Sequence, residues 1–85
     1  MLGRILVVDD DGVNRKLVSA SLDKRDYVVT TASSAYEALA VLAEADIDLV
    51  ILDIMMPGMS GMEMLSVIRQ TRSSSQLPVI MVTAK

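Results

Sequence analysis

The sequence predicts an α/β domain in which a parallel sheet lies between two layers of helices. Apolar runs with no polar alternation occur at residues 5–8, 49–52 and 79–82, as expected for strands that are covered on both faces. Segments with the apolar spacing of helices separate them. Strands that alternate with helices favour right-handed crossovers and therefore a parallel, three-layer sheet.

The first half of the chain contains two of the expected strands. Residues 4–8 form the first strand, and Asp11 and Gly12 turn the chain into a helix that continues to about residue 25. The apolar stripe of this helix consists of Val13, Leu17, Val18 and Leu22. We expect Arg15, like Lys16 and Lys24, to face water, and the same holds for Arg69 in the last helix. Residues 27–32 are β-branched and more polar, which fits an edge strand.

The second half repeats the alternation. Ser34 and Glu37 have the spacing of a capping box, which predicts a helix from there to about residue 45. The remaining elements are a strand at 49–52, a loop at 54–61, a helix at 62–71, a linker at 73–78 and a strand at 79–82. The side chains expected to face the core from the two helices are Ala38, Leu39, Leu42, Ala43, Met62, Leu65 and Ile68. No internal repeat interrupts this order.

Composition excludes several classes of function. The chain has 85 residues, enough for one small domain, and a hydrophobic fraction of 52%. It has no histidine and no cysteine, so histidine catalysis, thiolate metal sites and disulfides are excluded. A net charge of −3 argues against a nucleic-acid surface. Because charges interrupt every apolar run, we expect an intracellular protein that does not enter a membrane.

Carboxylates follow two of the predicted strands. Asp9 and Asp10 come directly after the first strand, and Asp53 follows the third. If these strands are parallel neighbours, the three side chains meet at the edge of the sheet where α/β proteins bind ligands. Converging carboxylates repel one another unless a proton or cation lies between them. Hard oxygen ligands suit Mg²⁺, and an aspartate beside such an ion can attack phosphorus to form an acyl phosphate.

Each of these residues also has a purely structural interpretation. Acidic residues after strands often cap the next helix. For Asp11 we expect either this role or simple solvation in the loop. One cap does not need two carboxylates, so Asp9 and Asp10 together favour the metal interpretation. For Asp53 alone both interpretations stand, and Thr83 at the end of the fourth strand is either a hydroxyl donor to a phosphoryl group or a simple β-former. The methionines of residues 55–64 fit core and loop packing better than a binding surface.

Three motifs together resemble the receiver domains of response regulators in two-component signalling. They are Val7-Val8-Asp9-Asp10, the run from Leu52 through Asp53-Ile54-Met55-Met56-Pro57-Gly58-Met59-Ser60 to Gly61, and Pro78-Val79-Ile80-Met81-Val82-Thr83-Ala84. The resemblance covers the whole chain. It implies a flavodoxin-like three-layer parallel sheet with strand order 2-1-3-4 over residues 1–85.

The resemblance also implies roles for individual residues. Asp53 is similar to the aspartate that accepts a phosphoryl group from a histidine kinase or a histidine phosphotransfer protein. Asp9 and Asp10 match the acidic pair that binds Mg²⁺, one of the two acting through water, and Asp53 is also a ligand. Met55 matches the position whose backbone carbonyl binds the metal. Thr83 matches the switch hydroxyl, and Ala84 follows it at the phosphate site.

The sequence departs from the family pattern at its end. The family continues through a fourth helix, a fifth strand with an essential lysine and a fifth helix, whereas this sequence ends at Lys85, which does not match that lysine. We therefore expect the 85-residue chain to label poorly with phosphate and to form homo-oligomers through an exposed fourth strand.

Three functions are compatible with the sequence. The first is a cytoplasmic signalling receiver with no separate substrate turnover. The second is a Mg²⁺-dependent phosphohydrolase, although the position for its second acid is occupied by Met55, which cannot exchange a proton. The third is a structural or assembly unit of the same fold whose acidic pocket has lost its function.

Overall fold

The fold consists of four strands and three helices in strict alternation. A computed structural model describes residues 3–82. Its elements are β1 (Arg4–Val8), α1 (Gly12–Asp23), β2 (Val28–Ala32), α2 (Ala35–Glu44), β3 (Leu49–Asp53), α3 (Gly61–Arg69) and β4 (Val79–Val82). Each strand and helix occurs where the sequence predicts it, with shifts of one or two residues at some ends. Within residues 3–82, no helix has the combination of length and apolar character that a membrane crossing requires.

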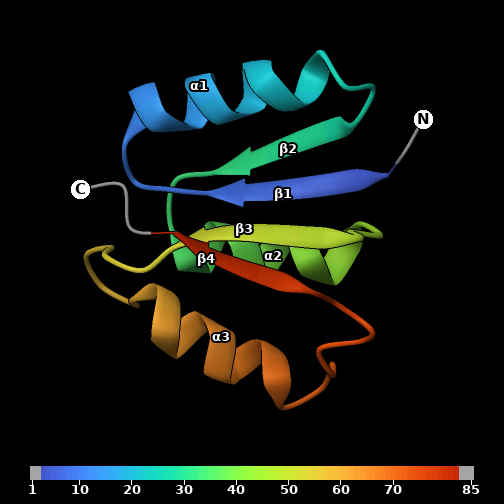
Figure 1. The fold of residues 1–85 in the computed structure, drawn as a ribbon. Coiled ribbons are helices and arrows are strands. Elements are labelled where there is room, and N and C mark those ends of the chain that lie inside the picture. Colours follow the sequence, from blue (N-terminus) through green and yellow to red (C-terminus); the bar gives the residue numbers. More distant parts are fainter. Residues whose placement is uncertain (1–2, 83–85) are drawn as a thin grey trace.

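All strand pairs in the described sheet are parallel, and the strand order is β2-β1-β3-β4. Val8 pairs with Ala32 of β2 and with Leu52 of β3, so these three strands end at nearly the same level. Asp53 pairs with Val82 of β4 one step further on. The four arrowheads in Figure 1 accordingly point to one edge of the sheet. The predicted strand order and direction are confirmed.

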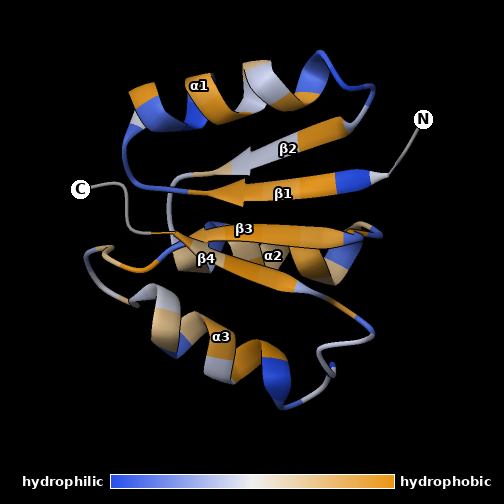
Figure 2. Ribbon diagram, viewed as in Figure 1, coloured by the Kyte–Doolittle hydropathy of each residue, from blue (hydrophilic) through white to orange (hydrophobic). Residues whose placement is uncertain are grey.

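The main core lies between the sheet and the helices α2 and α3. Leu6 and Val8 of β1 belong to this core, together with Val50 and Leu52 of β3. The helices and the loop before β4 contribute Ala35, Ala38, Leu42, Met64, Ile68 and Leu77. In Figure 2 the hydrophobic colour continues along β1 and β3, whereas much of β2 is paler, as expected for an edge strand.

The opposite face of the sheet is only partly covered. Ile5 and Val7 alternate with the core residues of β1, so they face the layer of α1, and both are buried. Ile51 and Ile80 occupy the same face on β3 and β4, because the register pairs Val7 with Ile51 and Ile51 with Ile80. Ile80 is 50% exposed. The apolar surface on this side therefore continues beyond the area that α1 covers.

The first helix is less buried than its sequence pattern predicts. None of its residues is fully buried, and Val13 and Leu17 are 66% and 63% exposed. The predicted apolar stripe is therefore wrong for these two positions. The helix also ends at Asp23 rather than near residue 25. The left-handed backbone of Asp26, with φ 66°, then turns the chain into β2.

Caps set the limits of the other helices. Ser34 accepts a hydrogen bond from the Glu37 amide, but the Glu37 carboxylate accepts one from the hydroxyl of Ser33. Only half of the predicted capping box is therefore formed. A complete box, which the sequence analysis missed, begins α3, where Ser60 and Glu63 bond reciprocally.

Two helical side chains expected in the core are exposed. The predicted core positions Ala43 and Met62 lie on the solvent side of their helices, and Met62 is 57% exposed. Met64 is fully buried instead. The helix α3 begins one residue earlier than expected, at Gly61.

Candidate functional site

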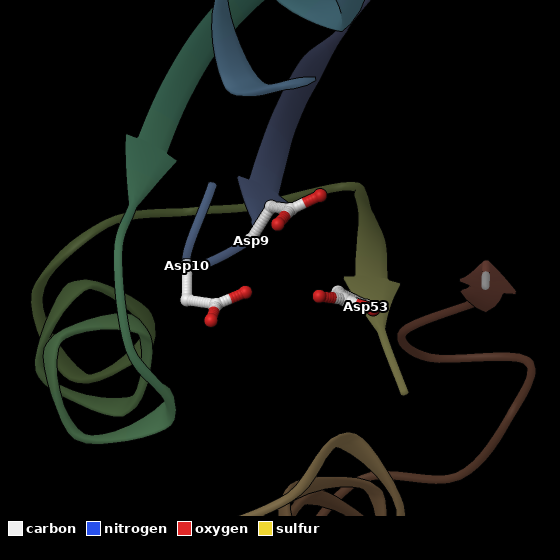
Figure 3. A group of neighbouring side chains, drawn as sticks. All are labelled: Asp9, Asp10 and Asp53. Atoms are coloured by element: carbon white, nitrogen blue, oxygen red, sulfur yellow. The ribbon is translucent and has the colours of Figure 1, made fainter. Parts of the chain in front are cut away.

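Three carboxylates meet at the carboxyl edge of the two central strands. Asp9 and Asp10 follow β1 directly, and Asp53 is the last residue of β3. One carboxylate oxygen of each residue lies within 4.8 Å of the others. Figure 3 shows the side chains of Asp10 and Asp53 extending toward each other, with Asp9 beside them. The convergence expected from the sequence is therefore present.

The three residues differ in their exposure to solvent. Asp9 and Asp53 are 5% and 0% exposed, whereas Asp10 is exposed. Carboxylates are seldom buried so completely unless a partner neutralises them. The open side at Asp10 gives an ion or a small anion access to the two buried groups. This arrangement fits a cation site.

Burial raises the pKa of the Asp53 carboxyl above its ordinary value of 3.8. The backbone amide of Met55 opposes this rise by donating a hydrogen bond to Asp53. The neighbouring carboxylate of Asp9 raises the pKa of Asp53 further. A divalent cation beside the cluster opposes this rise in pKa, because it favours the ionised form of each carboxylate.

The same local turn orients both buried carboxylates. The amide of Asp11 donates to Oδ1 of Asp9 at 2.9 Å, and the amide of Met55 donates to Oδ1 of Asp53 at 3.1 Å. Each bond links an aspartate to the amide two residues later, which is the pattern of an Asx turn. The two loops therefore fix their aspartates by matching local bonds at the ends of neighbouring strands.

Gly61 places the start of α3 against the backbone of Asp53. The amide of Gly61 donates to the carbonyl of Ile54 at 3.0 Å. A Cβ atom at residue 61 would lie 2.2 Å from the carbonyl oxygen of Asp53. Only glycine fits this close approach, so the sequence at position 61 determines how near α3 comes to the site.

The remaining predicted site residues have mixed outcomes. Met55 lies in the loop after β3, is 65% exposed, and donates its backbone amide to Asp53. Asp11 accepts a hydrogen bond from the amide of Val13 and caps α1, as predicted. Thr83 and Ala84 lie outside the described residues.

Two arginines expected to face water have backbone partners instead. Arg15 donates from Nη1 to the carbonyl oxygen of Asp9 at 2.7 Å. Arg69 donates from Nη1 to the carbonyls of Arg72, Ser73 and Leu77, and so closes the loop after α3. The expectation of solvent-facing side chains was wrong for both, because helical spacing does not show where a long side chain folds back. No sequence signal used above identifies the Arg15 contact.

Comparison with known proteins gives consistent results. The family model described as the response regulator receiver domain matches residues 5–85. The transcriptional regulatory protein ResD of Bacillus subtilis is 44% identical over 82 residues, which are 96% of this chain and 33% of ResD. The chain thus spans about a third of that relative's length.

Solved structures match the chain over nearly all of its length. The response regulator TrrA of Thermotoga maritima in complex with Mg²⁺-BeF superposes with a TM-score of 0.91 and 40% identity, over 99% of this chain and 71% of the other. A structure of the histidine kinase ThkA in complex with TrrA matches with a TM-score of 0.88 and 41% identity, over 98% of this chain and 70% of the matched one.

Proposed function

We propose, because this chain belongs to the response regulator receiver domain family, that Asp53 accepts a phosphoryl group in a Mg²⁺-dependent reaction of two-component signalling. In this reaction a carboxylate oxygen of Asp53 forms a bond to phosphorus while the bond between phosphorus and the donor nitrogen of a phosphohistidine breaks. The product is an acyl phosphate on Asp53. Residues 1–85 act as one unit in this proposal.

The observation that carries the proposal is the carboxylate cluster. Oxygens of Asp9, Asp10 and Asp53 within 4.8 Å of one another form an all-oxygen donor set, which fits Mg²⁺ and leaves positions for water. We propose that these three residues and the backbone carbonyl of Met55 hold the ion. When bound, Mg²⁺ neutralises charge on the phosphoryl oxygens. The chain's own part is to hold Asp53 buried and oriented by the Met55 amide.

The proposed phosphodonor is a histidine kinase or a histidine phosphotransfer protein. The match with TrrA in its complex with the kinase ThkA supports this partner. Nucleic acid and membranes are not partners of this domain in the proposal, and its place is the cytoplasm. Thr83 and Ala84, which follow β4, are proposed to contact the phosphoryl group, with Thr83 as the switch hydroxyl.

A phosphohydrolase is the less favoured alternative. Such an enzyme needs a second acid close to the nucleophile to protonate the leaving group. The residue two positions after Asp53 is Met55, whose side chain is exposed and carries no proton to exchange. A phosphoryl group on Asp53 therefore has no general acid at this position to assist further turnover.

Metal binding tests the first part of the proposal. A Mg²⁺ titration by calorimetry should give weak binding to the 85-residue chain, and Asp10→Asn should weaken it clearly, because a direct or water-bridged ligand is lost. Asp11→Asn is the matched control, because Asp11 caps α1 and asparagine caps helices equally well. Equal losses in the two variants would contradict the assignment of Asp10.

Phosphorylation tests the second part. The chain is incubated with Mg²⁺ and a small acyl-phosphate donor, and its intact mass and the released phosphate are measured. We expect a low yield of one phosphoryl group, stable in acid and labile in base, that disappears in Asp53→Asn. Labelling that persists in Asp53→Asn would overturn the assignment. Sustained release of free phosphate would favour the hydrolase, and neither label nor metal binding would favour a structural unit.

We also propose that residues 1–85 form dimers through β4. In the described sheet β4 pairs only with β3, so its other edge offers unpaired backbone groups. Ile80 on this strand is 50% exposed, and the sheet face beside it is not covered by α1. Pairing of two β4 strands across a two-fold axis buries both features.

A further inference from the structure

The side chain of Arg15 folds back onto the loop that carries two of the site carboxylates. Its Nη1 atom donates to the carbonyl oxygen of Asp9, six residues earlier, at 2.7 Å. Arg15 is half buried, whereas the next residue, Lys16, is exposed. Ordering a long side chain against the backbone costs conformational entropy. The hydrogen bond from Arg15 to Asp9 must therefore offset an entropy cost that the exposed side chain of Lys16 does not incur.

Helix electrostatics do not explain this placement. Arg15 belongs to the beginning of α1, where the partial charge of the helix is positive and a cation is unfavourable. Gly12, the first residue of α1, leaves room for the guanidinium, since a Cβ atom there would lie 3.3 Å from Nη2 of Arg15. The guanidinium is thus held beside the helix start by its bond to Asp9.

Hydrogen bonds within the described residues fix Asp9 at its amide, its carbonyl and its carboxylate. Its amide donates to the carbonyl of Ala32 in β2 at 3.1 Å, its carbonyl accepts from Arg15, and its Oδ1 accepts from the amide of Asp11. The pairing of β1 with β3 ends one residue earlier, at Val8. Arg15 therefore holds the backbone of Asp9 at the point where the strand ladder stops.

We propose that Arg15 is a positioning residue for the cation site. By fixing the carbonyl of Asp9, it sets the direction of the Asp9 carboxylate and the path of the chain into Asp10. This role rests on the proposed Mg²⁺ function of the cluster. It deepens that proposal by assigning a residue outside the carboxylates to the formation of the site.

The direction in which replacement of Arg15 changes the Mg²⁺ affinity distinguishes a positioning role of this residue from an effect of its charge. The positive charge of Arg15 repels a divalent cation, so removal of charge alone tightens Mg²⁺ binding. Loss of positioning weakens it, and loss of a group that orients a metal ligand typically costs about tenfold in affinity. A role confined to folding stability lowers the melting temperature and leaves the affinity of the folded protein unchanged.

The experiment is a calorimetric Mg²⁺ titration of the 85-residue chain and three variants, at a temperature where all are folded. We expect Arg15→Gln to weaken binding by roughly tenfold. Arg15→Lys should lie between Arg15→Gln and the wild type, because the lysine ammonium can still donate a hydrogen bond to the Asp9 carbonyl but lacks the planar donor group of arginine. Lys16→Gln removes the same charge from the neighbouring exposed position and should change the affinity by less than about twofold.

A second measurement does not need the metal. Without Mg²⁺, hydrogen exchange of the Asp11 amide, which donates to Asp9, should be faster in Arg15→Gln than in Lys16→Gln. Unchanged or tighter Mg²⁺ binding by Arg15→Gln would overturn the inference. If the wild type binds no Mg²⁺, the proposed function fails. The inference about Arg15 is then tested separately, and it is overturned if the Asp11 amide exchanges no faster in Arg15→Gln than in Lys16→Gln.

Discussion

Replacing Gly61 with alanine should disturb both the stability of the fold and the site. The added Cβ would lie 2.2 Å from the carbonyl oxygen of Asp53 and 2.9 Å from Cα of Ile54. Both neighbours are backbone atoms of the segment that ends β3, so no side-chain rotation relieves the contact. Comfortable carbon–oxygen contacts are about 3.3 Å or longer. The start of α3 and the end of β3 must therefore separate by about 1 Å.

The loss in the free energy of unfolding caused by Gly61→Ala follows from two opposing effects. Alanine gains up to about 1 kcal/mol over glycine within a helix. Overpacking costs about 1–3 kcal/mol, and an immobile backbone neighbour favours the upper end. We expect a net loss of about 2 kcal/mol in the free energy of unfolding. For a domain of this size, such a loss lowers the melting temperature by roughly 8–16 °C.

Thermal unfolding followed by circular dichroism, with and without Mg²⁺, measures this effect. Because α3 abuts Asp53, Gly61→Ala should also weaken Mg²⁺ binding, since sites of this type tolerate displacements of only about 0.5 Å. Gly12→Ala is the control for the melting temperature alone, because its Cβ would meet only the end of the Arg15 side chain, at 3.3 Å, and no backbone atom. A melting temperature for Gly61→Ala equal to that of Gly12→Ala would refute the reasoning.

Two further predictions concern pH and assembly. Burial raises the pKa of Asp53 in the folded state. The metal-free folded protein therefore binds the Asp53 proton more tightly than the unfolded chain does. The free energy of unfolding consequently falls as the pH rises from about 4 through the pKa of Asp53 in the folded state. Asp53→Asn should therefore raise the metal-free melting temperature at pH 7, by a margin that shrinks on acidification; a lower melting temperature at pH 7 would contradict this. In analytical sedimentation at tens of micromolar protein, the chain should form dimers. Ile80→Lys on β4 should dissociate these dimers, whereas Val28→Lys on β2, the opposite edge strand, should not. Equal behaviour of the two variants would exclude the β4 interface.

The fold was predictable from the sequence because its strands are unusually uniform. The apolar runs of β1 and β3 contain no alternation, which excludes a sheet with one solvated face and requires helices on both sides. The surface of α1 was not predictable in the same way. Its spacing is that of a buried stripe, yet Val13 and Leu17 are exposed. Periodicity shows which residues share a face, but not whether another element covers that face.

The carboxylates of the candidate site were predictable for a related reason. Parallel strands end at one edge of the sheet, so Asp9 and Asp53 converge as soon as β1 and β3 are neighbours. The residues that support them were not predictable. The contact of Arg15 with Asp9 and the close approach of Gly61 to Asp53 depend on how loops fold back in space. Thr83 and Ala84 stay predictions, because they lie outside the described residues.

The site combines rigid and accessible parts through its position in the sheet. Asp9 and Asp53 extend the two central strands, whose residues Leu6, Val50 and Leu52 are fully buried. Local bonds from backbone amides then orient both carboxylates. Asp10 is exposed, so a cation reaches the buried pair from that side. Packing fixes the strands, and hydrogen bonds fix the loops that follow them. Removing a side chain that bonds to one of these loops, as the Arg15 variants do, can therefore alter metal affinity while the core stays folded.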